Sequence, residues 1–164
     1  MSLGFQRCLS YPCVYVGKDL IIAVYVDDLT LFGLKSEIDQ VKRALSERLD
    51  VKDLGTAHML LSLHICRPSE GVITMDQIHY LDEILKEFGM EDCRGKVSPL
   101  PVGEDKEADC NVSCDQAKYG KAIGSLLYLA NGTCPDVAFA VGKMASYCEN
   151  PTMAYWYRVR YAYF

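Results

Sequence analysis

The sequence predicts an α+β fold, in which strands dominate the first part of the chain and helices dominate the last part. Apolar runs rich in β-branched and aromatic residues occupy residues 13–33 and 59–75, and helical apolar spacing dominates after residue 116. A polar, acidic segment at residues 91–115 separates the two regions. Half of the 164 residues are hydrophobic and 24% are charged, which is typical of a globular rather than a disordered chain.

The first predicted strand is residues 13–16, and turn chemistry follows it. Residues 20–26 are almost unbroken apolar, a pattern typical of a strand that is buried on both faces. Asp27 and Asp28 interrupt this run, and residues 29–33 resume it. This order predicts a β-hairpin with the two aspartates at its tip.

Two amphipathic helices are predicted in the same part of the chain. Residues 37–49 have apolar side chains at helical spacing, and Ser36 with Asp39 forms an acidic variant of the capping box. Residues 77–88 repeat the helical spacing, and Gly89 is well placed as the C′ residue. Both helices should therefore pack one apolar face against neighbouring strands or helices.

Residues 59–66 and 72–75 are two further strand candidates, joined by a hairpin connection at residues 68–71. Helices are predicted again at residues 116–130 and 137–149, with Pro135 suited to a first helical turn. The aromatic-rich end of the chain has two interpretations: stacking on nucleic-acid bases or packing of a last helix, which we favour.

The charge balance limits the classes of function. A net charge of −5 argues against a free-standing nucleic-acid binder, although the chain could supply one wall of a larger groove. No secretory signal is evident, and the longest apolar run is far too short to span a bilayer. We therefore expect an intracellular protein, cytoplasmic or nuclear, that is neither secreted nor attached to a membrane.

The cysteines and histidines are the other candidate metal ligands, and neither set has the spacing typical of a metal site. Eight cysteines lie scattered without a CxxC pair, and we interpret them as reduced thiols. A zinc site at Cys110 and Cys114 lacks an evident second ligand pair. His58, His64 and His79 are not spaced as a metal triad, so ordinary surface or core histidines are the favoured interpretation.

The adjacent carboxylates of Asp27 and Asp28 have two interpretations. Aspartates are frequent in turns because their side chains bond to nearby backbone groups. Two carboxylates on a rigid, open hairpin tip also suit divalent ions, which relieve the repulsion between them and could serve phosphoryl transfer. The residues alone leave both interpretations open.

The motif at residues 25–28, Tyr-Val-Asp-Asp between apolar strands, resembles the catalytic hairpin of reverse transcriptases. The chain as a whole resembles the copia branch of retrotransposon polymerases, most specifically at residues 123–133 and 135–142. The other matching positions follow in family order: Leu3-Gly4-Phe5, Pro12-Cys13-Val14-Tyr15, Lys52-Asp53-Leu54-Gly55, His58, Gln77, Tyr80-Leu81, Phe88-Gly89-Met90, Ser98-Pro99-Leu100-Pro101, Asn150-Pro151-Thr152 and Trp156.

The resemblance implies the C-terminal part of the reverse transcriptase domain of a Pol polyprotein. Asp27 and Asp28 would be catalytic Mg²⁺ ligands, with Tyr25 and Val26 near the primer end. The partners would be an RNA or DNA primer–template and deoxynucleoside triphosphates. The implied parts are a partial palm with an antiparallel sheet and packed helices, a linker, and a helical thumb-like or connection segment: residues 1–90, 91–115 and 116–164.

The same resemblance places the third catalytic aspartate of the family on an earlier palm strand, upstream of Met1. We therefore expect the chain to be inactive alone and to need an upstream reverse transcriptase half. The alternative is a non-catalytic remnant or a protein-interaction module, which the acidic net charge favours.

Overall fold

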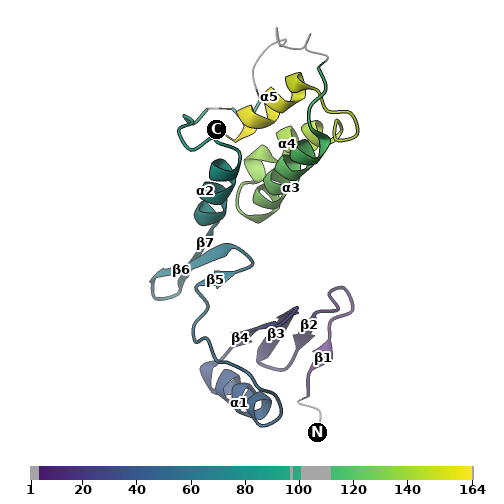
Figure 1. Ribbon diagram of the computed structural model, residues 1–164. Coiled ribbons are helices and arrows are strands. Elements are labelled where there is room, and N and C mark those ends of the chain that lie inside the picture. The colour runs from purple at the N-terminus through teal and green to yellow at the C-terminus, as the bar shows by residue number, and fades with distance from the viewer. Residues whose placement is uncertain (1–3, 97, 101–111, 164) are drawn as a thin grey trace. The chain divides into compact units, whose positions relative to one another are not determined.

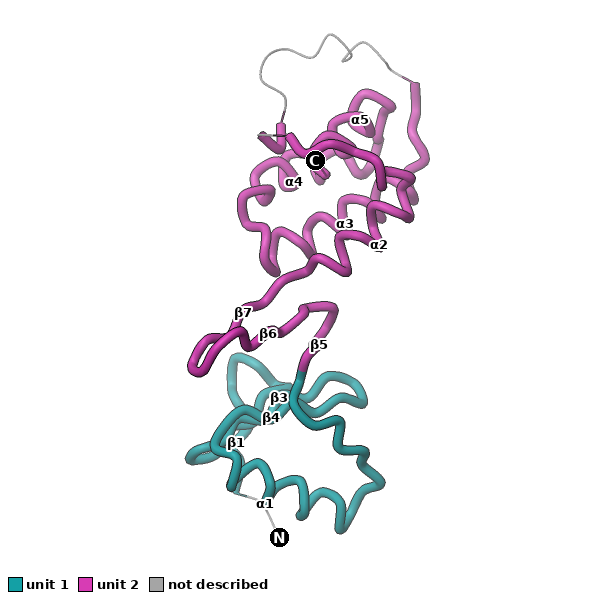
Figure 2. The backbone as a smooth tube through the Cα atoms, turned by 90° about the vertical axis from the view of Figure 1, so that its left-hand side faces the viewer, with its two compact units in different colours: residues 1–57 teal, residues 58–164 magenta. Residues whose placement is uncertain are grey.

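A computed structural model describes residues 4–96, 98–100 and 112–163 of the chain. The chain divides into two compact units, residues 1–57 and 58–164 (Figures 1 and 2). Within the described residues there are two antiparallel sheets and five α-helices, so the predicted α+β class is confirmed. None of the helices in the described ranges is both long and apolar enough to cross a membrane.

The first unit is a four-stranded antiparallel sheet with the strand order β1-β2-β3-β4. Its elements are β1 (Gln6–Arg7), β2 (Val14–Val16), β3 (Leu20–Tyr25), β4 (Asp28–Gly33) and the helix α1 (Lys35–Ser46). Leu20, Ile22 and Val41 form the centre of its core, because α1 packs against one face of the sheet. The predicted first strand and the predicted hairpin are both present.

Two details of this unit correct the sequence predictions. Strand β3 is not buried on both faces: Leu20 and Ile22 are buried, whereas Ile21 and Tyr25 are exposed. The reason is that α1 covers only one face, so alternate side chains lie on the uncovered one. The predicted capping box is also absent, since α1 begins at Lys35 and its N-cap residue, Leu34, makes no side-chain cap.

The second unit begins with a three-stranded antiparallel sheet of order β5-β6-β7. Its strands are β5 (Met59–Leu60), β6 (Leu63–Ser69) and β7 (Val72–Asp76). The prediction of one strand across residues 59–66 is wrong, because the chain turns at Leu61 and Ser62. Their φ angles are 49° and 60°, the left-handed values that a type I′ hairpin turn requires. Strand β6 also continues to Ser69, within the predicted connection at residues 68–71.

Helices complete the second unit. They are α2 (Ile78–Glu87), α3 (Gln116–Gly132), the 3₁₀ turn η1 (Pro135–Val137), α4 (Ala138–Ala145) and α5 (Met153–Ala162). Gly89 ends α2 as predicted, with φ 65° and the two backbone hydrogen bonds of a Schellman motif, from Gly89 to Lys86 and from Met90 to Leu85. The predicted helix at residues 137–149 is shorter, since α4 ends at Ala145.

One core joins the helices of the second unit. Tyr119 and Leu126 of α3, Met144 of α4 and Val159 of α5 are each at most 1% exposed. Trp156 of α5 is buried in the same cluster. The packing interpretation of the aromatic-rich end is confirmed for Trp156 and Tyr163, whereas Tyr157 is exposed. The proposed Cys110–Cys114 site lies partly outside the described residues.

Candidate functional site

The paired carboxylates lie on the β3–β4 hairpin. The two strands pair from Leu20 opposite Gly33 at one end to Tyr25 opposite Asp28 at the other. Val26 and Asp27 alone form the loop, so Asp28 is the first residue of β4. The prediction that both aspartates form the tip is therefore wrong by one residue: Val26 shares the loop with Asp27.

The backbone of this loop is strained at Val26, whose φ is 51°. A β-branched side chain is rarely found in this region because it crowds the backbone. Such a conformation costs of the order of 1–3 kcal/mol and occurs mainly at functional sites. The strain is tolerated because the register of the two strands fixes a two-residue loop.

The carboxylates themselves are open to solvent, since Asp27 and Asp28 are both exposed. Carboxylate oxygens are hard ligands that fit Mg²⁺, and exposure leaves room for the waters that this ion retains. Within the described residues, no third histidine, cysteine or acidic side chain joins them in a metal-binding cluster. The pair therefore suits a divalent ion but supplies only part of a coordination shell.

The far end of the hairpin is packed closely. A Cβ atom at Gly33 would overlap the backbone carbonyl oxygen of Asp19 and would lie 2.7 Å from the Cδ1 atom of Leu20.

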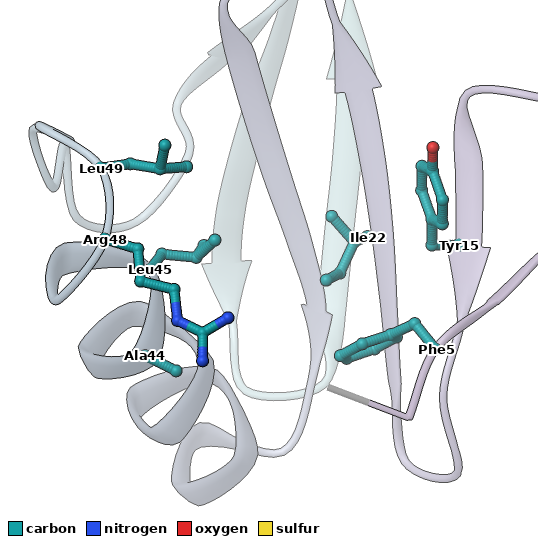
Figure 3. Close-up of a pocket in the computed structure, with 7 residues that line it drawn as sticks. All are labelled: Phe5, Tyr15, Ile22, Ala44, Leu45, Arg48 and Leu49. Atoms are coloured by element: carbon teal, nitrogen blue, oxygen red, sulfur yellow. The ribbon is translucent and has the colours of Figure 1, made fainter. Parts of the chain in front are cut away.

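A pocket of about 400 Å³ lies between the covered face of the sheet and the end of α1 (Figure 3). It is lined by Phe5, Tyr15, Ile22, Ala44, Leu45, Arg48 and Leu49. Neither aspartate of the hairpin reaches it, so we interpret it as incomplete packing rather than as part of the carboxylate site.

In the second unit, residues that also matched the reverse transcriptase resemblance form a buried hydrogen-bond network around Gln77. Gln77, immediately before α2, is 3% exposed. Its side-chain oxygen accepts hydrogen bonds from the backbone N–H of Thr133 (3.0 Å) and from the Thr133 hydroxyl (2.9 Å). Its side-chain nitrogen donates to the carbonyl of Tyr128 (3.5 Å). The Tyr128 hydroxyl donates in turn to the carbonyl of Leu61, so one network ties the β5–β6 turn and the start of α2 to α3.

We expect Val26→Gly to stabilise the hairpin by about 1 kcal/mol, because glycine removes the strain at positive φ and loses only part of this gain in chain entropy. Hydrogen-exchange mass spectrometry of β3–β4 peptides measures the effect. Val24→Gly, in strand β3 just before the loop, is the matched control and should destabilise the hairpin. Slower exchange in Val24→Gly, or faster exchange in Val26→Gly, contradicts the strain argument.

Comparison with known proteins decides the family. Residues 1–102 match the family described as reverse transcriptase (RNA-dependent DNA polymerase). The chain belongs to this family. Its reverse transcriptase character thus extends over the carboxylate hairpin of the first unit and into the second unit, as far as the helix α2 and beyond.

The relatives of this reverse transcriptase chain include Pol polyproteins of copia-type retrotransposons. The retrovirus-related Pol polyprotein from transposon TNT 1-94 of Nicotiana tabacum is 31% identical over 98% of this chain. The corresponding polyprotein from transposon RE2 of Arabidopsis thaliana is 28% identical over 95% of it, and an uncharacterized mitochondrial protein of the same plant is 29% identical over 82%. The chain spans 13%, 11% and 56% of these three relatives, respectively.

No solved structure matches this chain significantly. Reverse transcriptases as a family generally use divalent metal ions and act on nucleic acids. The carboxylate chemistry of the β3–β4 hairpin is compatible with the first of these properties.

Proposed function

We propose that Asp27 and Asp28 bind Mg²⁺ and serve nucleotidyl transfer in a copia-type reverse transcriptase that copies RNA into DNA. One observation supports this most: two adjacent, exposed carboxylates project from a strained hairpin in a chain of the reverse transcriptase family. The bound ions would neutralise the charge on the transferred phosphate and align the attacking and leaving oxygens.

The residues of the chain have distinct tasks in this proposal. Asp27, from the loop, and Asp28, from the first position of β4, would hold the ions. Tyr25 and Val26, which are both exposed, would lie near the primer end, because the resemblance to reverse transcriptases places the primer end at these positions. The incoming deoxynucleoside triphosphate and the primer–template are the corresponding partners.

The division into palm, linker and thumb-like parts belongs to the same proposal. Residues 1–90 would be the partial palm, residues 91–115 the linker, and residues 116–164 the thumb-like or connection segment. The order of sheets followed by helices supports this sequence of parts, although residues 58–90 belong to the same compact unit as residues 116–164, and Ile84 and Met90 lie in the core around α3.

We further propose that the chain needs a partner segment for activity. Two carboxylates supply too few ligands for a two-ion site, and the described residues bring no third ligand to the pair. An upstream reverse transcriptase half that carries a further aspartate would complete the coordination shell.

The metal role is tested by titrating the full chain with Mg²⁺ and following backbone amide NMR signals. We expect shifts confined to the β3–β4 loop, which disappear in Asp27→Asn and Asp28→Asn. Asp19→Asn is a matched control, because Asp19 is also exposed but lies at the other end of the same hairpin. Equal binding by Asp27→Asn and the unmodified chain would show that the pair has no special metal role.

A second candidate function, a non-catalytic protein-interaction module, is supported by the uncovered face of the first sheet. Val16, Ile21, Tyr25 and Phe32 lie on this face by strand register, and each is more than 40% exposed. A contiguous exposed apolar face is typical of interaction surfaces. If the chain associates with itself or with another protein, Ile21→Lys and Phe32→Lys should weaken that association. A chain that stays monomeric and monodisperse, or an association that neither substitution weakens, would contradict this candidate.

A further inference from the structure

The β6–β7 hairpin of the second unit brings three chemically different side chains together. His64 and Cys66 are two residues apart on β6 and therefore lie on the same face of the strand, and Asp76 is paired directly opposite His64 on β7. Their potential ligand atoms all lie within 4.8 Å of one another. Each side chain is neither fully buried nor fully exposed, so the group is accessible from solvent.

The two distances from His64 are close to those between ligands of one tetrahedral ion. The Nδ1 atom of His64 is 3.2 Å from Oδ2 of Asp76 and 3.5 Å from Sγ of Cys66. Zinc–ligand bonds of about 2.0–2.3 Å at tetrahedral angles place neighbouring ligand atoms about 3.4–3.6 Å apart. All three atoms lie within 4.8 Å of one another, so a single ion can contact them once the Cys66 and Asp76 side chains rotate toward a common point.

The carboxylate of Asp76 is oriented by the backbone. Its Oδ1 atom accepts a hydrogen bond from the N–H of Ile78 (3.2 Å), at the start of α2, which leaves Oδ2 directed at His64. The helix α2 therefore positions one of the three ligands.

A fourth potential ligand comes from α2 itself. The rings of His64 and His79 are edge to face, with centroids 5.6 Å apart and planes inclined by 78°. Two imidazoles that share one tetrahedral ion have centroids about 5 Å apart, from the same bond lengths. His79 lies outside the cluster of three, and its ring must move toward His64 to supply a fourth bond.

We propose that His64, Cys66 and Asp76, with His79 as the fourth ligand, form a binding site for a borderline divalent transition metal such as Zn²⁺. Mixed nitrogen, sulfur and carboxylate ligands select this class of ion over Mg²⁺, which prefers oxygen ligands alone. The ion would link β6, β7 and the first turn of α2, and would thereby stabilise the hairpin against the helix. This site is independent of the polymerase proposal, in both its residues and its metal.

An alternative use of the same residues is a Cys–His–Asp nucleophile, in which His64 would activate the Cys66 thiol. In that arrangement the thiol should lie close to one ring nitrogen and the carboxylate should bind the other. The Sγ atom of Cys66 is instead nearly equidistant from Nδ1 and Nε2, at 3.5 Å and 3.7 Å. Oδ2 of Asp76 also approaches Nδ1, at 3.2 Å, so the thiol and the carboxylate do not engage opposite ring nitrogens as the nucleophile arrangement requires.

The test is a titration of the reduced, metal-free full chain with Co²⁺ in the presence of excess Mg²⁺. We expect the visible bands of tetrahedral cobalt together with a thiolate charge-transfer band, both removed by one equivalent of Zn²⁺. Cys66→Ser should abolish the charge-transfer band. His64→Gln, Asp76→Asn and His79→Gln should each weaken binding at least about tenfold.

Two cysteine variants are the matched controls. Cys13→Ser changes an exposed thiol of the first unit, and Cys114→Ser changes a thiol of the second unit outside the hairpin; both should retain the spectrum. Circular dichroism and the fluorescence of Trp156 confirm that every variant is folded.

The proposal is overturned if no tetrahedral spectrum appears, or if the spectrum survives in Cys66→Ser and is lost in Cys114→Ser. Rapid alkylation of Cys66 that Zn²⁺ does not slow would also overturn it, and would point to the nucleophile instead. An unchanged affinity in His79→Gln would remove His79 from the ligand set.

Discussion

Primer extension by this chain, combined with an upstream reverse transcriptase half from a related copia element, is expected to fall at least about 100-fold when Asp27 or Asp28 is changed to asparagine. Asparagine keeps the size of the side chain but loses the charge that holds a divalent ion. Metal ions contribute several kcal/mol to stabilising the transition state of phosphoryl transfer, and each 1.4 kcal/mol corresponds to about tenfold in rate. Incorporation of labelled nucleotide on an RNA template measures the loss.

The controls for this experiment separate catalysis from assembly. Asp19→Asn, at the other end of the same hairpin, should leave extension unchanged. The chain without the upstream half should give no extension. Extension by the combined halves that tolerates both Asp27→Asn and Asp28→Asn would eliminate the catalytic role of the pair. An absence of extension from any combination of folded halves would instead contradict the enzyme proposal.

Gly132→Ala is expected to lower the free energy of unfolding of the second unit by about 2 kcal/mol. Alanine would normally stabilise a helix by up to about 1 kcal/mol relative to glycine. At this position, however, its Cβ would overlap the side-chain amide of Gln77, which is buried and hydrogen-bonded to Thr133. Moving the amide leaves buried polar groups without partners, at about 1–3 kcal/mol for each group.

Urea denaturation followed by the fluorescence of Trp156 measures this effect, since this single tryptophan is buried in the helical core. Gly124→Ala is the matched control: it lies in the same helix, and nothing lies within 4 Å of its added Cβ, so it should stabilise. In a Gln77→Ala background, Gly132→Ala should have almost no further cost, because the obstructing side chain is gone. A stabilising Gly132→Ala in the unmodified chain would refute the role of this contact.

The regular elements could be predicted because local patterns determine them. The apolar run before the aspartates predicts β3, and helical spacing followed by Gly89 predicts α2 and its end. The turn at Leu61 and Ser62 was missed, because its left-handed backbone usually requires asparagine or glycine and neither residue is present. It is stabilised from a distance by Tyr128, which no local pattern reveals.

In the candidate sites, too, features set by neighbouring residues could be predicted, and features set by pairing between strands could not. The Asp27–Asp28 pair is visible in the sequence because the two residues are adjacent, but the strained Val26 depends on the strand register and was not predicted. The group of His64, Cys66 and Asp76 was not predicted. The spacing of the histidines along the chain does not show that Asp76 lies opposite His64 across the hairpin. The useful signal would have been a histidine and a cysteine two apart in one strand, opposite an acidic residue in the next.

The contact between Gln77 and Gly132 restricts which substitutions these two positions can accept during evolution. The two residues are far apart in sequence, yet the Gln77 side chain occupies the space that a side chain at position 132 would need. A larger residue at 132 becomes acceptable only after position 77 has become smaller, and a lost Gln77 removes the constraint on position 132. Sequence drift in related elements should therefore replace the two together, as a correlated pair, and rarely one at a time.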